Sequence, residues 1–261
     1  MRKLELKMVE ILKKLKDKYD VAEIKAEFET EATRMDELMR LKEITEKAGL
    51  GLVLKIGGAE AVTDMLNGQL IGVSGIVAPM IESSYSMLKY LEAIEKHFDK
   101  DLKENLHFGA NIETFLAYKN LDNILKLKNI QLLKSLTLGR TDMCGSLGLS
   151  KRDINTDQIY KIAEDMFLKI KKKDFKTKMG GGMSPESIPF LKKLSQKKLL
   201  DFFETRKVIF KIPKNFKKTA EGILLANEFE VLWLESKRDY YEKIYYEDVV
   251  RIKELRRRMK K

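Results

Sequence analysis

Two segments of the chain end a short apolar run with a carboxylate. In the first, residues 108–112 precede Glu113, and in the second, residues 136–138 precede Gly139 and Asp142. In parallel α/β folds, side chains at the carboxyl ends of buried strands lie where active sites form. Two carboxylates from neighbouring strands can hold one hard divalent cation, with water or substrate oxygens completing its coordination. The spacing therefore predicts metal-assisted chemistry.

Each acid has a simpler alternative role. A single acid after a strand more often caps the following helix. The pairing of Glu113 with Asp142 favours a site, as do Gly139 and Gly145, which free the backbone near Asp142. Mg²⁺ or Mn²⁺ is expected rather than zinc, because neither acid has a Cys or His at ligand spacing. The lone Cys144 is interpreted as a small buried hydrophobe.

Alternating strand-like and helix-like segments would position these acids. Periodicity predicts helices over residues 3–18, 34–48, 84–97, 156–173 and 185–194, and strands over 24–29, 52–56, 75–81, 107–113, 136–141, 177–181 and 207–212. Repeated strand–helix units imply parallel strands with helices outside. The pattern predicts an α/β fold, a TIM-type (β/α)8 barrel with an N-terminal helix. The eighth strand is not recognisable, so the barrel's completeness stays open.

The C-terminal stretch has a different character. From about residue 220 to residue 260 it contains no proline and only one glycine, and its apolar residues fall at helical spacing. This predicts one or two long helices, and a division into a barrel domain (1–216) and a C-terminal helical extension (217–261). The extension either packs on the barrel or reaches a neighbouring subunit, because aromatic-rich helical faces suit interfaces. We expect a homo-oligomer formed through these helices.

Composition limits the classes of partner. The 261 residues carry a net charge of +11, and 44% are hydrophobic. No apolar run approaches the length of a membrane span, and the start of the sequence lacks a signal-peptide core. A single cysteine fits a reducing compartment. We therefore expect a cytoplasmic protein without membrane association. The lysine runs are typical of solvated helix faces. No zinc-finger, RNP-type or helix-turn-helix signature is present, so we expect an anionic small molecule rather than nucleic acid as partner.

The two carboxylate segments resemble one enzyme family. Residues 111–125, NIETFLAYKNLDNIL, resemble the "IET…A…N.D.IL" pattern of the HpcH/HpaI aldolase and citrate lyase β-subunit family. Residues 139–148, GRTDMCGSLG, are similar to its "G..DL..SLG" segment, and residues 77–82, VAPMIE, resemble its "V.PM.E" strand. Residues 178–182, KMGGG, occupy the place of a later glycine-bearing strand. The resemblance spans about residues 25–194.

This resemblance implies a pyruvate- or phosphoenolpyruvate-type barrel whose divalent metal is held by Glu113 and Asp142. In the family, the metal chelates a pyruvate-like unit and stabilises the enolate that forms when a C–C bond breaks or forms. Backbone N–H groups from Gly139 to Asp142, including Thr141, would receive the substrate carboxylate. Lys55 falls where relatives carry an arginine that contacts the keto oxygen. The implied substrates are keto acids, sugar-linked or CoA-linked molecules among them.

The sequence departs from the family at the base and at Arg140. Family aldolases place a Glu-His pair after an early strand. Here Glu29 aligns with the Glu, but Thr30 occupies the His position. Glu29 or Glu31, with a pKa raised by burial, or a metal-bound water, is then the candidate base. Arg140 stands where relatives often have a small residue, and it either binds a second anionic substrate group or forms a salt bridge.

The only histidines, His97 and His107, fall on a helix face and at a strand start, away from the acids, and are interpreted as structural. Two hypotheses follow. The first is a metal-dependent carbon–carbon lyase or aldolase. The second is a non-catalytic barrel that serves as an interaction or regulatory protein, suggested by the missing histidine and the long basic C-terminal helix. Binding of Mg²⁺ or Mn²⁺ separates the two.

Overall fold

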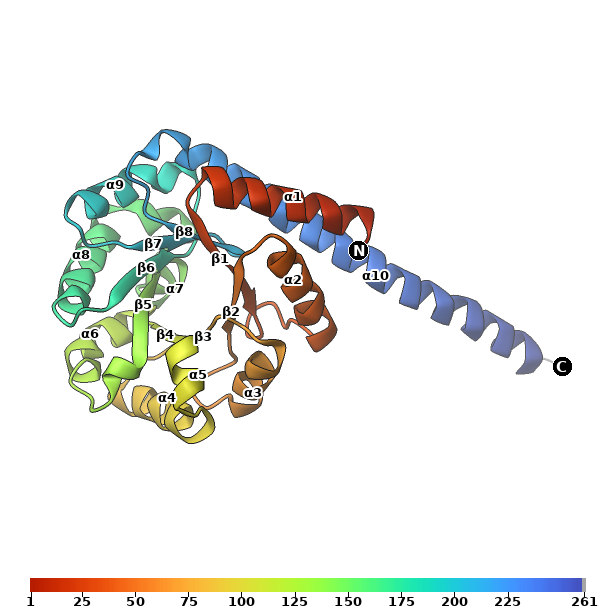
Figure 1. Cartoon of the computed structure of the whole chain (residues 1–261), viewed down its shortest axis with the longest axis horizontal. Helices are drawn as coiled ribbons and strands as arrows, with labels where there is room; N and C mark the ends of the chain where they lie inside the picture. The colour runs from red at the N-terminus through yellow and green to blue at the C-terminus, as the bar shows by residue number, and fades with distance from the viewer. Residues whose placement is uncertain (260–261) are drawn as a thin grey trace.

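A closed barrel forms the centre of the molecule (Figure 1). The computed structural model describes residues 1–259, within which eight strands follow one another around the barrel. They are β1 (Val21–Glu27), β2 (Gly51–Lys55), β3 (Gly75–Ala78), β4 (His107–Asn111), β5 (Leu133–Gly139), β6 (Lys176–Gly180), β7 (Phe202–Glu204) and β8 (Val208–Lys211). β1 to β7 pair in parallel, so their carboxyl ends open on one face. The TIM-type α/β fold is confirmed.

The barrel closes through a hairpin rather than through an eighth strand–helix unit. β8 is antiparallel to both β7 and β1, and Thr205 N donates to Val208 O at 2.9 Å across the turn. The prediction of 207–212 as a seventh parallel strand is therefore wrong in direction. Periodicity could not detect β7, because three residues are too few to show an alternating pattern.

Helices surround the barrel. They are α1 (Lys3–Lys18), α2 (Met35–Lys47), α3 (Val62–Ile71), α4 (Ser84–His97), α5 (Lys100–Asn105), α6 (Phe115–Ile124), α7 (Arg140–Ser146), α8 (Asp157–Lys171) and α9 (Ile188–Gln196). Periodicity alone does not predict α3, α5, α6 or α7. Arg140 and Thr141, expected at a strand end, instead begin α7, because β5 already ends at Gly139.

The two faces of the barrel strands differ in character. Outward-facing apolar residues such as Ile24, Leu54 and Leu136 join the helices in one continuous core. The interior holds only a small apolar cluster around Val53, Val77 and Ile209. Further polar side chains fill it towards the carboxyl end. A buried polar group costs stability unless it is paired, and several charges of this interior, among them Lys25, Glu27 and Glu204, are paired with one another.

One helix, α10 (Thr219–Met259), accounts for the whole C-terminal stretch. Its first part packs beside α1 and buries apolar side chains, among them Phe229, Leu232 and Trp233. Its last part continues beyond the body of the molecule (Figure 1). The first part is the predicted packed helix, and contact of the last part with a neighbouring subunit stays a prediction. The division after residue 216 stays a prediction, and residues 260 and 261 of the basic end lie outside the described residues.

The sequence predicts no membrane association, because no apolar run is long enough to span a bilayer. Within residues 1–259, no helix combines the length and the apolar character that crossing a bilayer requires.

Candidate active site

The carboxyl ends of the parallel strands surround a cavity of about 470 Å³. This volume suits a small ligand. Five of the predicted site residues line it, namely Lys55, Glu113, Gly139, Thr141 and Asp142. The other residues around it are mostly polar or charged: Lys25, Glu27, Thr30, Asn111, Thr137, Lys151, Gly180, Gly181, Gly182, Met183, Glu204, Thr205, Arg206, Asn227 and Glu230.

Glu113 lies between β4 and α6, and its side chain is 3% exposed. Met80 N donates to its Oε1 at 3.0 Å, and Asn111 Nδ2 donates to its Oε2 at 3.2 Å. Met80 reaches this position with a left-handed φ of 49°, an uncommon conformation for a non-glycine residue. These contacts fix the carboxylate at the cavity wall.

Burial raises the pKa of the Glu113 carboxyl, and the nearby charges of Asp142 and Glu29 raise it further, although Lys55 and the Met80 amide act in the opposite direction. Burial is thus the main cause of the raised pKa of Glu113. Asp142 lies on the first turn of α7 and is exposed. A buried carboxylate beside an exposed one is an arrangement that a divalent cation would stabilise.

The donor set fits a hard cation held mainly by non-protein ligands. Within residues 1–259 there is no group of three or more His, Cys, Asp or Glu residues suited to a metal ion. Glu113 and Asp142 would thus supply two carboxylates and leave the other positions to water and substrate. Mg²⁺ typically binds proteins in this way, through one or two carboxylates.

Two glycines allow the backbone to approach this site closely. A Cβ on Gly139 would lie 2.5 Å from Oε2 of Glu113, so only glycine leaves room for that carboxylate. Gly181 has a φ of 80°, and a Cβ there would lie 2.5 Å from the backbone nitrogen of Thr141. The start of α7 is therefore packed directly against the loop after β6.

Lys55 ends β2 and points into the cavity wall beside Glu29, with Nζ 2.6 Å from Oε2 of Glu29. Burial by itself would lower the pKa of Lys55, but the charges of Glu113, Glu29 and Glu27 outweigh it and raise that pKa. The ammonium group is therefore positively charged at neutral pH. This state suits electrostatic contact with an anion and opposes a role as an amine nucleophile.

Neither Glu29 nor Glu31 lies in the cavity lining. Glu29 pairs with Lys55, and Glu31 pairs with the buried Lys207 and accepts a hydrogen bond from Thr33 Oγ1 at 3.4 Å. Each of these carboxylates is therefore turned towards a lysine. Their expected role as bases therefore needs correction, because each is already used to neutralise a lysine.

The expectation that Arg140 binds substrate also needs correction. Arg140 is 0% exposed and does not line the cavity. Its guanidinium donates to the backbone oxygens of Gly180 (3.2 Å) and Gly181 (2.8 Å) and to Asn155 Oδ1 (2.6 Å) and Ser187 Oγ (3.2 Å). It also lies over the ring of Phe190. Arg140 therefore joins α7 to the loop after β6 and has no donor turned towards the cavity.

A buried charge network below the two acids was not predicted. Lys25 on β1 lies 2.6 Å from Glu204 and 3.1 Å from Glu27, and Arg206 lies 3.5 Å from Glu27. The alternation of Lys25 and Glu27 along one strand is a signal that could have identified two of its members. Glu204 could not be identified in that way, because it belongs to the undetected β7.

Glu230 is a further residue that sequence reasoning missed. It comes from α10, is half-buried and lines the cavity. Burial raises the pKa of its carboxyl, while Lys207 and Arg206 lower it and Glu31 and Glu27 raise it. No hydrogen bond to a described residue contributes to that shift. Because Glu230 lies on a helix far along the chain, no local sequence pattern connects it with the site.

The two histidines lie away from the cavity. His107 begins β4 at the opposite end of the barrel, with Nε2 3.4 Å from Glu23, and a Cβ on its neighbour Gly75 would collide with its ring. His97 ends α4 on the outside of the barrel. Neither side chain lines the cavity, so a histidine base is absent from this site within the described residues.

Comparison with known proteins bears on the fold. No protein-family model and no curated protein matches the sequence. Among solved structures, an HpcH/HpaI aldolase from Desulfitobacterium hafniense DCB-2 is 14% identical with a TM-score of 0.58, over 76% of this chain and 81% of that chain. An HpcH/HpaI aldolase/citrate lyase family protein from Burkholderia cenocepacia J2315 is 11% identical with a TM-score of 0.60, over 91% and 90%.

A variant of the citrate synthase SbnG is 16% identical with a TM-score of 0.58, over 76% of this chain and 81% of that chain. Identities this low establish shared architecture alone. The strand order, the carboxyl-end cavity and these neighbours together assign the chain the barrel fold of HpcH/HpaI aldolase and citrate lyase family structures.

Proposed function

We propose that this protein is a divalent-cation-dependent carbon–carbon lyase or aldolase that acts through the enolate of a pyruvate-type keto acid. The observation that carries the proposal is the pair of carboxylates, Glu113 and Asp142, at one cavity on the carboxyl-end face of the barrel. The sequence resemblance to the HpcH/HpaI aldolase and citrate lyase β-subunit family supports it, and so does the shared fold.

Glu113 and Asp142 would hold Mg²⁺ or Mn²⁺. When bound, the cation would act as a Lewis acid towards the keto and carboxylate oxygens of the substrate. Lys55 would add a fixed positive charge near the developing enolate oxygen, because its ammonium lies within the electrostatic influence of Glu113. Unlike an arginine, it would do so as a point charge rather than as a two-pronged donor.

The substrate carboxylate would bind at the start of α7. The first N–H groups of a helix have no acceptor within the helix, so they are available to an anion. Gly139 and Thr141 line the cavity at that point. Lys151 and Arg206 also line it and would favour a second anionic group on the substrate, which agrees with the basic character of the chain.

Glu230 is our candidate for the acid–base group. Of the carboxylates that line the cavity, Glu27 and Glu204 are paired with Lys25, and Glu113 and Asp142 form the proposed cation site. Glu230 is the remaining one. A half-buried carboxylate with a raised pKa holds a proton more readily than an exposed one, which suits a group that accepts and returns a proton. In the exchange reaction, the C–H bond of the keto acid methyl breaks, its proton passes to Glu230 and its electron pair becomes the enolate.

Proton exchange in pyruvate tests the proposal directly. With Mg²⁺ or Mn²⁺ in D₂O, the protein should replace the methyl protons of pyruvate with deuterium, followed by NMR, and should decarboxylate oxaloacetate. Glu113→Gln and Asp142→Asn should each reduce both rates by about 100-fold or more, because a cation held by one carboxylate is bound weakly and out of position. Glu230→Gln should reduce exchange by about 100-fold.

Two matched variants serve as controls. Asp157→Asn removes an acid from the first turn of α8, as Asp142→Asn does from α7, and Glu228→Gln removes an exposed carboxylate two residues before Glu230. Both should retain the full rates. If the unaltered protein exchanges no protons and decarboxylates no keto acid with any divalent cation, the enzymatic proposal fails.

The non-catalytic alternative rests on the absence of a histidine from the cavity. It predicts that calorimetry detects no uptake of Mg²⁺ or Mn²⁺, with or without pyruvate. Uptake by the unaltered protein that is lost in Glu113→Gln would rule that alternative out.

A further inference from the structure

The end of α10 lacks any neighbour in the described chain. Tyr241 Oη still donates to Glu37 on α2, at 2.6 Å. We name residues 241–259 the α10 arm. Lys243, Tyr246 and Glu247 line a groove beside the start of α1, and the rest of the arm extends away from the body (Figure 1). An isolated helix of this length is only marginally stable in water. Packing against another surface would therefore stabilise the arm.

A regular stripe runs along the arm. Positions 241, 245, 248, 252, 255 and 259 alternate by four and three residues, the spacing of a coiled-coil seam. They carry Tyr241, Tyr245, Asp248, Ile252, Leu255 and Met259. Beyond the partly buried Tyr241, the apolar members are open to solvent, with Tyr245 70% and Met259 83% exposed. Large apolar side chains at seam spacing are typical of a helix that pairs with another helix.

The charges on the arm are segregated along its length. Residues 239–248 hold four acids and one lysine, whereas residues 251–258 hold five basic residues and one acid. Two copies of this segment running in opposite directions would bring the acidic block of each against the basic block of the other. We propose that the α10 arms of two copies of this chain pair antiparallel and make the protein a dimer.

The seam has one register that satisfies this pairing. A two-fold axis beside residue 250 aligns Tyr245 with Leu255 of the second copy, Tyr241 with Met259, and Asp248 with Ile252. Asp248 then lies beside Arg251 of the second copy, which can neutralise it. A polar residue in a seam lowers stability and fixes the register of the pair.

On one flank of the seam, residues 242, 249 and 256 agree with the same register. Glu242 would face Arg256 of the second copy twice in each dimer, and Val249 would face its own counterpart at the axis. Within the described residues, the ion pair recorded inside the arm joins Arg251 to Glu254 at 3.3 Å, so Glu242 and Arg256 are unpaired there. Both are thus available for contact between copies.

A parallel pair would lose these contacts. It would place Asp248 against Asp248 in the seam. Like charges in such positions are destabilising, so the sequence disfavours parallel pairing.

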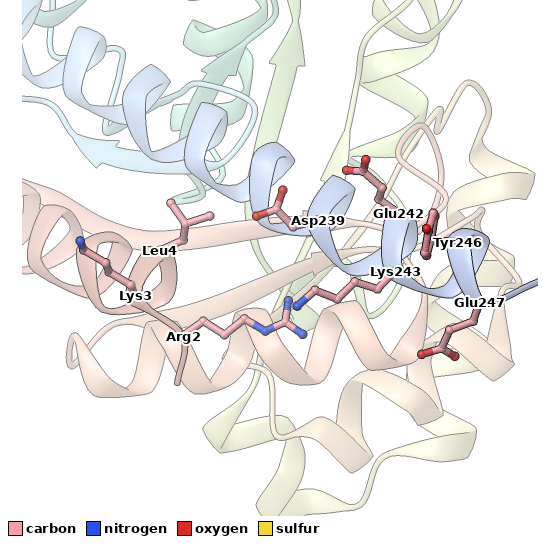
Figure 2. Close-up of a pocket in the computed structure, with 8 residues that line it drawn as sticks. All are labelled: Arg2, Lys3, Leu4, Asp239, Glu242, Lys243, Tyr246 and Glu247. Atoms are coloured by element: carbon pink, nitrogen blue, oxygen red, sulfur yellow. The ribbon is translucent and has the colours of Figure 1, made fainter. Parts of the chain in front are cut away.

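The pairing leaves a nearby groove open. A groove of about 660 Å³ lies between the start of α1 and α10, lined by Arg2, Lys3, Leu4, Asp239, Glu242, Lys243, Tyr246 and Glu247 (Figure 2). Asp239, Lys243 and Tyr246 share one side of α10, about half a turn from the stripe at the helical angle of 100° per residue. The second copy would thus lie on the stripe and not in this groove.

Charge exchange tests the pairing in the full chain. Light scattering after size exclusion should show a dimer, and Glu242→Arg or Arg256→Glu should each weaken dimerisation by about tenfold or more, because two facing pairs become repulsive. The double variant, Glu242→Arg with Arg256→Glu, should restore the dimer. Arg257→Glu makes the same charge change on the side of the helix away from the seam, and should have no effect.

Cross-linking tests the direction. Val249→Cys should form a disulfide-linked dimer on mild oxidation, whereas Val250→Cys, which points away from the seam, should not. The native Cys144 is buried and does not interfere. A monomeric full chain, a dimer unaffected by the charge variants, or equal cross-linking at both positions would each overturn the proposal.

Discussion

Glu113 is buried, and its carboxylate forms no ion pair of its own with a lysine or an arginine among the described residues. Together these two properties cost folding free energy. Burial and the neighbouring acids raise its pKa even though Lys55 is close. Two hydrogen-bond donors, from Met80 and Asn111, hold it in place rather than neutralise it. A residue in this condition is poised to bind a cation, because the cation removes the penalty that burial imposes.

The stability of the cation-free protein should therefore depend on Glu113 and on pH. The folded state keeps the Glu113 proton at pH values where the unfolded state, with an ordinary value of 4.5, has lost it. Unfolding free energy should then fall as pH rises through this range. Glu113→Gln should lack this fall. Urea unfolding of both proteins in EDTA, from about pH 4.5 to about pH 7.5, measures the difference.

Exposed Glu43→Gln should follow the unaltered protein across the same range. Mg²⁺ should stabilise the unaltered protein at neutral pH and leave Glu113→Gln unchanged. Parallel stability curves for the unaltered protein and Glu113→Gln would contradict this account of the buried carboxylate.

At the scale of elements, the site depends on how closely β5, α7 and the loop after β6 approach one another. Arg140 joins α7 to that loop through buried hydrogen bonds, and Gly181 lies against the first turn of α7. Gly139 leaves space for Glu113. These contacts hold Asp142 beside Glu113, although the two acids belong to different strand–helix units.

Gly139→Ala should therefore damage the site more than the fold. Its Cβ would lie 2.5 Å from Oε2 of Glu113 and 2.8 Å from its Cβ, so Glu113 must move. A displacement near 1 Å can reduce a catalytic rate by about 100-fold, so we expect a loss of that order in pyruvate exchange.

Gly145→Ala is the matched control. A Cβ at Gly145 meets nothing within 4 Å, and the residue lies within α7. This variant should keep its activity and gain up to about 1 kcal/mol in unfolding free energy. Equal exchange rates in the two variants would show that close packing at Gly139 has no bearing on the site.

At the scale of the whole molecule, α10 has three roles along one helix. Its first half completes the core with Phe229, Leu232 and Trp233. In the same region, Asn227 and Glu230 reach the cavity. Its last part is the exposed α10 arm. The boundary between the body and the arm therefore falls inside a single element.

Shortening the chain at two places should separate these roles. A chain that ends after Lys243 should keep cooperative unfolding and its melting temperature, because none of the described residues that it loses is buried. A chain that ends before Thr219 should fail to fold. It loses several buried apolar side chains worth about 1.5–3 kcal/mol each, which together rival the stability of a typical domain. Cooperative thermal unfolding of the shorter chain would contradict this role of α10.

The sequence predicted six of the parallel strands and much of the outer helix layer, because their periodic apolar patterns are local. It also predicted that Glu113 and Asp142 lie at strand ends, and both do line one cavity. It did not predict the β7–β8 hairpin, because β7 has three residues. It did not predict the pairing of Lys55 with Glu29 or of Lys207 with Glu31, because such pairs depend on distances between strands.

By itself, the sequence determined which residues could bind a cation and which elements would carry them. Side-chain chemistry and helix or strand periodicity depend only on residues close together in the chain. Only the tertiary structure decided which charges are already neutralised. It buried Arg140 outside the cavity, gave Glu29 and Glu31 to lysines, and brought Glu230 to the cavity from the far end of the chain. The physical reason is that electrostatic interaction depends on distance and burial, which chain closure creates and local pattern does not contain.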